Sequence, residues 1–181
     1  MLRVGLTGGI ATGKSTVSRL FVECGARLID ADVLARIAGE PGTPACREIA
    51  AAFGREMLRA DGSVDRERLG AVVFGDPAKR ARLEAIIHPY VFAEEERLFR
   101  EITAEDPHAV VLFDAALLIE TGAYKRKDRV IVVTADEPTQ LRRLMDRNKL
   151  TEEEARARIR SQMPLAGKVA VADYVIDGTL P

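Results

Sequence analysis

A glycine-rich stretch near the N-terminus holds the residues whose types and spacing most clearly indicate chemistry. Residues Gly8 to Ser15 read GGIATGKS and fit the pattern G-x-x-x-x-G-K-[ST] at every fixed position. An apolar run precedes the stretch and a helical pattern follows it, which is the context of a phosphate-binding loop. Backbone amides would surround phosphate oxygens, Lys14 would reach the β- and γ-phosphates, and the Ser15 hydroxyl would bind Mg²⁺.

The residues predicted to bind the nucleotide are Gly8, Gly9, Ile10, Ala11, Thr12, Gly13, Lys14, Ser15 and Thr16. Gly8 and Gly13 allow backbone conformations that a side chain would hinder. Thr16 is placed to contact the α-phosphate. Such a loop occurs in kinases, GTPases and motor ATPases alike, so other segments must separate these classes.

Two segments argue against a GTPase. Residues 114–117 read DAAL and lack the glycine of a D-x-x-G motif. Residues 148–151 read NKLT, lack the guanine-binding carboxylate of N-K-x-D, and follow a predicted helix rather than a strand. The further motifs of transport ATPases are also lacking from the sequence. These observations favour a kinase that phosphorylates a small molecule, which needs a base, a metal site and cations.

Two carboxylates, Asp30 and Asp32, follow the second predicted strand. Ligands of open α/β sheets bind at the carboxyl ends of the strands. Alternation along an extended chain predicts that both side chains point to the same side, where one could accept the proton of the acceptor hydroxyl. The alternative is that one of them only caps the helix that begins near Val33.

Arg143 and Arg147 lie four residues apart on a predicted helix and therefore share a face. A pair of guanidinium groups suits phosphate oxygens, although a solvated basic face is the alternative. His88, next to Pro89, interrupts an otherwise apolar helix. A lone histidine in such a place is more often structural than catalytic.

Short aliphatic runs predict the strands that position these residues: 2–6, 27–29, 110–113, 130–133 and 174–176. Runs of this kind are typical of a parallel sheet covered by helices. Helical patterns occupy residues 14–24, 66–74, 77–103 and a block at 137–171, in which 151–154 (TEEE) predict a capping box. Many more residues separate the second and third strands than a simple crossover needs, so we expect an inserted helical region there.

Composition limits the classes of partner. The chain has 181 residues, 47% of them apolar and 30% charged, with a formal net charge of −1. This balance predicts an ordinary globular domain without the basic surplus of a protein that binds nucleic acid or membranes. Because the sequence has only two cysteines and no apolar stretch of membrane-helix length, we expect a cytoplasmic protein.

The chain resembles the dephospho-CoA kinase family over nearly its whole length. Matching pieces, in order, are the phosphate loop, IDAD (29–32), IIHP (86–89), ALLIE (116–120), YKRKDRVIVV (124–133), QLRRLMDRN (140–148), and ARIRSQMP, K and ADYVID within 157–177. Each piece is short, and their common order makes the resemblance specific.

The resemblance implies an α/β fold with a P-loop NTPase core, a five-stranded parallel sheet flanked by helices, and helical substrate-binding and lid insertions. It implies ATP-dependent phosphorylation of the 3′-hydroxyl of dephospho-CoA with Mg²⁺, giving coenzyme A and ADP. The implied site residues are Asp32 as general base, Lys14 and Arg143 in catalysis, Arg143 and Arg147 on ATP, and Asp30, Asp32, His88 and Leu117 on the acceptor.

The implied organisation is one kinase domain with a core (about 1–34, 90–136 and 163–181), an acceptor-binding region (about 35–89) and a lid (about 137–162). We expect a monomer or weak homo-oligomer. Two alternatives are another small-metabolite or nucleoside monophosphate kinase and a catalytically weak nucleotide-binding regulator.

The sequence departs from the family pattern at a few positions. Ala11 and Thr12 stand where Gly and Ser are usual, Ala116 replaces a proline, and Gly178 replaces a common asparagine. Family members usually continue beyond the position of Pro181 into a final helix. We therefore expect one face of the sheet to be exposed and part of the adenine pocket to be incomplete.

Overall fold

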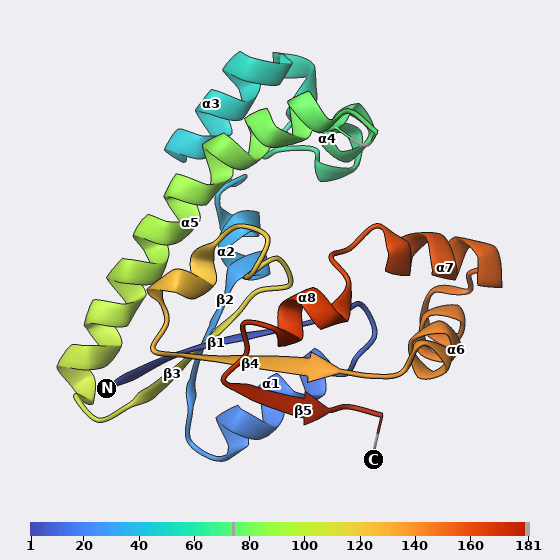
Figure 1. Cartoon of the computed structure of the whole chain (residues 1–181). Coiled ribbons are helices and arrows are strands. Elements are labelled where there is room, and N and C mark those ends of the chain that lie inside the picture. The colour runs from blue at the N-terminus through green and yellow to red at the C-terminus, as the bar shows by residue number, and fades with distance from the viewer. Residues whose placement is uncertain (74, 180–181) are drawn as a thin grey trace. The chain divides into compact units, whose positions relative to one another are not determined.

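A computed structural model of the chain describes residues 1–73 and 75–179. The chain divides into two compact units (Figure 1). The first, here called the sheet unit, comprises Met1–Asp30 and the chain from Ile102 onward. The second, here called the helical unit, comprises Ala31–Glu101. The sheet unit contains the phosphate loop, and the helical unit contains the whole of the predicted acceptor-binding region, about 35–89.

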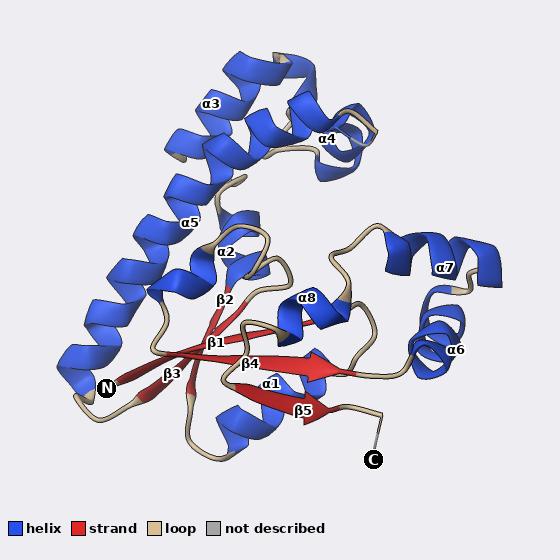
Figure 2. Cartoon of the chain, in the orientation of Figure 1, coloured by secondary structure: helices blue, strands red, loops and turns tan. Residues whose placement is uncertain are grey.

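The sheet has five parallel strands in the order β2-β3-β1-β4-β5 (Figure 2). Their bounds are β1 Leu2–Gly8, β2 Arg27–Asp30, β3 Val110–Asp114, β4 Arg129–Thr134 and β5 Tyr174–Asp177. All five predicted strands are present, and each extends one or two residues beyond the predicted carboxyl end. The predicted parallel α/β fold is therefore confirmed.

The register of the strands gathers polar residues at the carboxyl edge of the sheet. Asp30 of β2 pairs with Asp114 of β3, and Leu6 of β1 pairs with the same Asp114. The phosphate loop leaves β1 at this edge, directly after Gly8. This edge therefore brings two carboxylates of neighbouring strands to the level of the loop.

Helix α1 (Lys14–Glu23) packs on one face of the sheet. Its Val17 and the half-buried Phe21 contact a core formed by Val4, Leu6, Leu112, Ile131 and Val133. Further along the same face, Leu2, Leu28, Val110 and Tyr174 are exposed. Among the described residues this face is thus covered only in part, as expected.

The predicted helical block after β4 consists of three helices: α6 Glu137–Asn148, α7 Glu152–Arg160 and α8 Leu165–Val169. The capping box is confirmed, because the Glu154 amide donates to Thr151 Oγ1 at 3.3 Å and the Thr151 amide donates to the Glu154 carboxylate at 2.8 Å. Leu141, Leu144 and Ala155 form the core of α6 and α7, and Ile10 and Ala11 pack against it. The predicted lid therefore rests on the phosphate loop.

The helical unit contains α2 Ala31–Ile37, α3 Pro44–Phe53, α4 Arg66–Val73 and the first part of α5 Pro77–Glu105. Its core is formed by Cys46, Ile49, Met57, Val64 and Leu69. The helix predicted over 66–74 is present to Val73, and Phe74 lies outside the described residues. No helix among the described residues is long and apolar enough to cross a membrane.

Candidate active site

The phosphate loop joins β1 to α1 and ends at Gly13, the residue that precedes α1. Gly13 has φ = +96°, a left-handed conformation that glycine adopts without steric cost. It has no side chain that could cap the helix, so the start of α1 has no side-chain cap from this residue. Uncapped amides at the positive end of a helix dipole favour an anion. The local geometry therefore suits a phosphate group.

Side chains of α6 and of the segment after α7 hold the loop by its backbone. Gln140 Nε2 donates to the Ile10 carbonyl at 2.7 Å, and the Ile10 amide donates to Gln162 Oε1 at 2.7 Å. Arg143 donates to the Ala11 carbonyl at 3.3 Å. Ala11 itself has φ = +59°, which is uncommon for a residue with a side chain. These bonds fix the loop in a conformation that Ala11 alone would disfavour.

Lys14 forms a close ion pair with Asp114 at the end of β3. Asp114 is buried, and burial raises the pKa of its carboxyl group, while the Lys14 ammonium partly opposes this rise. The charge of Asp30 adds to the increase. Asp114 was not among the site residues predicted from the sequence. The available signal was a carboxylate directly after an aliphatic run, the same signal that pointed to Asp30.

A cavity of about 750 Å³ lies beside the loop. Loop and helix residues line one part of it: Ala11, Gly13, Ser15, Thr16, Val17 and Leu20. Arg143, Asp146 and Arg147 of α6 line a second part, and Ile176, Asp177 and Gly178 line a third. The structure therefore brings Arg143 and Arg147 together with Ser15 and Thr16 around one space.

The chain after β5 passes close to the loop at Gly178. The Gly178 carbonyl accepts from Arg143 at 2.8 Å, and its amide donates to the Thr134 carbonyl at 2.7 Å. A Cβ atom built at Gly178 would collide with the Thr12 carbonyl oxygen. Glycine is therefore suited to this position, and an asparagine here would require the loop or the end of β5 to shift.

Asp30 and Asp32 lie in different elements. Asp30 is the last residue of β2, whereas Asp32 is the second residue of α2 and is exposed. The prediction that both side chains point to the same side assumed an extended chain, but the chain becomes helical at Ala31, so strand alternation does not apply to Asp32. Asp32 lies inside the first turn rather than at the capping position. There its charge interacts favourably with the positive end of the helix dipole.

The two other predicted acceptor residues lie in separate units. His88 of α5 is half-buried in the helical unit, with its ring centroid 6.1 Å from that of Phe92 and the rings inclined by 41°. Leu117, in the segment after β3 of the sheet unit, is exposed. The structure therefore places His88 in an aromatic contact and Leu117 at the surface.

A fully buried lysine, Lys168, holds the segment that follows Asp114. Lys168 of α8 donates to the Ala116 carbonyl at 2.8 Å and forms an ion pair with Glu120 at 2.8 Å. Thr7 Oγ1 of β1 donates to the same Ala116 carbonyl at 3.1 Å. Both contacts with Ala116 use its backbone carbonyl, which a proline would also supply. Ala116 in place of the usual proline therefore keeps these two hydrogen bonds.

Oxygen donors for a divalent metal ion are present at the loop. The described residues contain no group of three or more His, Cys, Asp or Glu side chains arranged to hold a metal ion. Mg²⁺ at phosphate sites, however, usually takes one or two carboxylates together with phosphate oxygens and water. The Ser15 hydroxyl and the Asp114 carboxylate, which contacts the neighbouring Lys14, fit such a donor set.

Comparisons with known proteins agree with this geometry. The family model described as dephospho-CoA kinase matches residues 2–180. A dephospho-CoA kinase of Streptomyces avermitilis is 49% identical over 181 residues, covering 100% of this chain and 87% of the relative. One from Geobacillus kaustophilus is 50% identical over 180 residues, covering 97% of this chain and 87% of the relative.

Solved structures are also similar over nearly the whole chain. The protein TT1252 from Thermus thermophilus is similar with a TM-score of 0.79 and 35% identity, over 95% of this chain and 85% of that one. A dephospho-CoA kinase from Campylobacter jejuni is similar with a TM-score of 0.63 and 27% identity, over 98% and 88%. The similarity thus extends over sheet, loop and helices alike.

Proposed function

The chain belongs to the dephospho-CoA kinase family, and on that premise we propose that it transfers the γ-phosphoryl group of ATP to the 3′-hydroxyl of dephospho-CoA. The products are coenzyme A and ADP. The observation that carries the proposal is the cavity at the phosphate loop, where Ser15, Arg143 and Arg147 meet in a chain that matches the family over residues 2–180.

ATP binds with its phosphates on the loop, residues 8–16. The amides before and within the first turn of α1 donate to phosphate oxygens, and Thr16 lies along the same cavity. Phosphoryl transfer depends on positioning and on stabilising charge in the transition state. We assign the second role to Lys14 and Arg143, with Arg147 on the nucleotide phosphates.

Ser15 and Asp114 would hold the Mg²⁺ that accompanies ATP, and the metal ion would neutralise charge on the β- and γ-phosphates. Lys14 forms an ion pair with Asp114. ATP phosphates would offer Lys14 a further anionic partner, so that the Asp114 carboxylate could act as a metal ligand.

Asp32 is the proposed general base. Its carboxylate accepts the proton of the 3′-hydroxyl while the 3′-oxygen forms a bond to the γ-phosphorus. The bond between the γ-phosphorus and the bridging oxygen breaks, and its electron pair stays with ADP. We assign acceptor binding to the region of about 35–89, with Asp30, His88 and Leu117 near the acceptor, and we assign the lid to about 137–162.

We further propose that the enzyme acts in the cytoplasm as a monomer or weak homo-oligomer, without a nucleic-acid or membrane partner. The net charge of −1 supports the last point, because it provides no long-range attraction to nucleic acid or to an anionic membrane.

An acceptor panel tests the proposed function. The purified protein is mixed with ATP, Mg²⁺ and dephospho-CoA, AMP, shikimate or gluconate, and ADP release is measured. We expect release with dephospho-CoA and only background release with the others. Release with another acceptor instead would identify a different small-molecule kinase, and ATP binding without turnover of any acceptor would indicate a nucleotide-binding regulator.

A further inference from the structure

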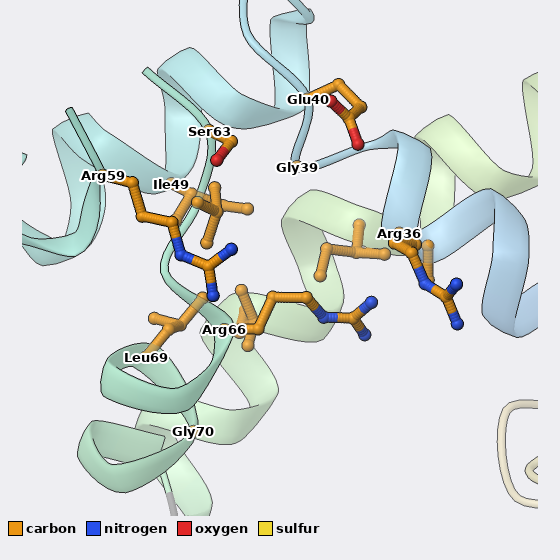
Figure 3. Close-up of a pocket in the computed structure, with 13 residues that line it drawn as sticks. Arg36, Gly39, Glu40, Ile49, Arg59, Ser63, Arg66, Leu69 and Gly70 are labelled. Carbon is orange, nitrogen blue, oxygen red and sulfur yellow. The ribbon is translucent and has the colours of Figure 1, made fainter. Parts of the chain in front are cut away.

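The helical unit contains a cavity of its own, of about 300 Å³. It lies among α2, α3, α4, α5 and the segment between α3 and α4 (Figure 3). Its lining residues are Ala35, Arg36, Gly39, Glu40, Ile49, Arg59, Ser63, Val64, Arg66, Leu69, Gly70, Leu83 and Ile87. This volume is at the lower end of the range for small-molecule pockets.

The floor of the cavity is part of the core of the helical unit. Ile49, Val64 and Leu69 are 1%, 5% and 5% exposed and belong to the same packed cluster. Leu83 and Ile87 of α5 pack against that cluster. Because packed core side chains have fixed positions, the shape of the cavity is preformed. Its apolar floor also strengthens electrostatic interactions at the rim by lowering the local dielectric constant.

The rim is strongly basic. Arg36, Arg59 and Arg66 line it, and Figure 3 shows Arg59 and Arg66 extending from the side of Ile49 and Leu69, with Arg36 on the neighbouring helix. None of the three forms an ion pair within 4 Å or a side-chain hydrogen bond with a residue that the structure describes. Glu40 is the one carboxylate among the lining residues. The lining residues thus carry three positive charges and one negative charge, a formal excess of two positive charges, and the charges of Asp61 and Asp65 outside the lining also act on Arg59.

We propose that this cavity binds the diphosphate group of the acceptor, dephospho-CoA; this inference rests on the proposed function. The diphosphate of dephospho-CoA is a diester and carries two negative charges at neutral pH, which matches the excess of the rim. Arginine presents a planar fork of donors that fits phosphate oxygens in bidentate geometry. A diphosphate therefore supplies the acceptors that the three guanidinium groups lack.

The spacing of two residues on α2 supports this placement. Asp32 and Arg36 are four residues apart within Ala31–Ile37, so they share a helix face and are separated by roughly 6 Å along the axis. In dephospho-CoA the 3′-hydroxyl and the 5′-diphosphate are attached to one ribose, a few covalent bonds apart. One helical turn can therefore present a base to the 3′-hydroxyl and a guanidinium to the diphosphate.

Charge removal at the rim tests the proposal. Binding of dephospho-CoA is measured by calorimetry, with the nucleotide site filled by Mg²⁺ and a non-hydrolysable ATP analogue so that the adenosine diphosphate part of the acceptor cannot occupy the loop. We expect Arg66→Gln to raise the Kd for dephospho-CoA about tenfold or more and Arg59→Gln/Arg66→Gln to raise it further. The KM for ATP stays unchanged in both variants.

Arg80→Gln is the matched control, because Arg80 is an exposed arginine of the same unit that does not line the cavity. It should leave the Kd unchanged. The Kd of the wild-type protein should also rise more steeply with salt than that of the double variant, because fewer ion pairs remain to be screened.

The outcomes separate this inference from the proposed function. The inference alone is overturned if the wild-type protein binds and phosphorylates dephospho-CoA and the double variant does so equally well. In that case the Kd of the double variant lies within twofold of the wild-type Kd, and both depend on salt to the same extent. A wild-type protein that neither binds nor phosphorylates dephospho-CoA overturns the proposed function and the inference with it. Thermal unfolding is the folding control: each variant should unfold at the wild-type midpoint, because the substituted arginines are exposed.

Discussion

The phosphate loop and the arginine-lined cavity differ in how their polar groups are satisfied. Around the loop, Ile10 and Ala11 are bound by side chains of α6 and of the segment after α7, and Lys14 contacts Asp114. Around the cavity, Arg59 and Arg66 have no ion pair or side-chain hydrogen bond with a described residue. The donor site is therefore held in position by the protein itself, whereas the cavity rim leaves its charges available for a ligand.

This difference has a consequence for the energy of each site. Groups with internal partners must give up those partners when a ligand binds, and this lowers the net binding free energy. The same partners hold the groups in position before the ligand binds. Arginines without an ion pair or a side-chain hydrogen bond to a described residue have no such partner to exchange and gain more from an anion. We therefore expect changes at the phosphate loop and at Asp32 to affect the rate of transfer, and changes at the cavity rim to affect acceptor affinity.

The largest expected effect is that of Asp32→Asn in the helical unit. Loss of a general base should lower kcat by about two or more orders of magnitude. The Kd for ATP, measured by calorimetry, should remain at the wild-type value. A variant with nearly wild-type kcat would show that Asp32 only positions the acceptor or stabilises the first turn of α2.

Lys14→Ala should have the next largest effect. Removing this cation takes away charge stabilisation of the transferring phosphoryl group, so we expect kcat to fall by roughly 10²–10³. Lys125→Ala removes an exposed lysine of the same unit and should leave kcat unchanged. Equal rates for Lys14→Ala and the wild-type protein would exclude the loop lysine from the reaction.

Lys168→Met tests how much Lys168 contributes to stability by holding the segment that follows Asp114. The substitution keeps the buried volume but leaves the Ala116 carbonyl without one donor and Glu120 without its ion pair. We expect the free energy of unfolding to fall by about 1–3 kcal/mol, because Glu120 is partly exposed and can regain water. Denaturant unfolding measures the change, and an unaltered midpoint would show that the segment is held without Lys168.

Thr151→Ala should have the smallest effect, about 1 kcal/mol, through loss of the capping box of α7. Hydrogen bonds from the backbone and side chain of Thr151 lower the pKa of Glu154 from its ordinary value of 4.5. The contribution of Glu154 is therefore full above pH 4.5 and is lost as the pH falls through the lowered pKa. The difference in thermal stability between wild type and variant should be larger at pH 7 than in acid, where only the pH-independent bond from the Glu154 amide to Thr151 Oγ1 still separates them. A difference that is constant with pH would contradict this.

The loop was predictable because its residues are contiguous. The motif in residues 8–15 requires only local backbone geometry, and the aliphatic runs on either side determine strand and helix. The five strands followed for the same reason, since a buried parallel strand is a short aliphatic run. Arg143 and Arg147 could be predicted as a pair because their spacing is that of one helix face.

Other features depend on contacts between distant residues and could not be found in this way. Lys14 and Asp114 are 100 positions apart, and the sequence gives no sign that they meet. Gln140 and Gln162 act on the backbone of Ile10, which no residue pattern reveals. Asp30 and Asp32 were assigned a common side because strand and helix boundaries cannot be separated at single-residue precision.

The cavity of the helical unit is the clearest case of this kind. Arg36 lies in a helix, Arg59 in an irregular segment and Arg66 at the start of α4. In the sequence each of them resembles an ordinary solvated arginine. Only the packing of Ile49, Val64 and Leu69 produces the space that the three side chains share.

The most direct measurement is the identification of the product formed from dephospho-CoA, ATP and Mg²⁺. Phosphorus NMR of the reaction mixture distinguishes a new phosphomonoester on the 3′-oxygen from unchanged dephospho-CoA and from inorganic phosphate. We predict one 3′-phosphomonoester for each ADP released, with formation slowed by about two or more orders of magnitude in Asp32→Asn. ATP consumption that yields inorganic phosphate alone, or a phosphorylated acceptor only when dephospho-CoA is replaced by another alcohol, would contradict the proposed function.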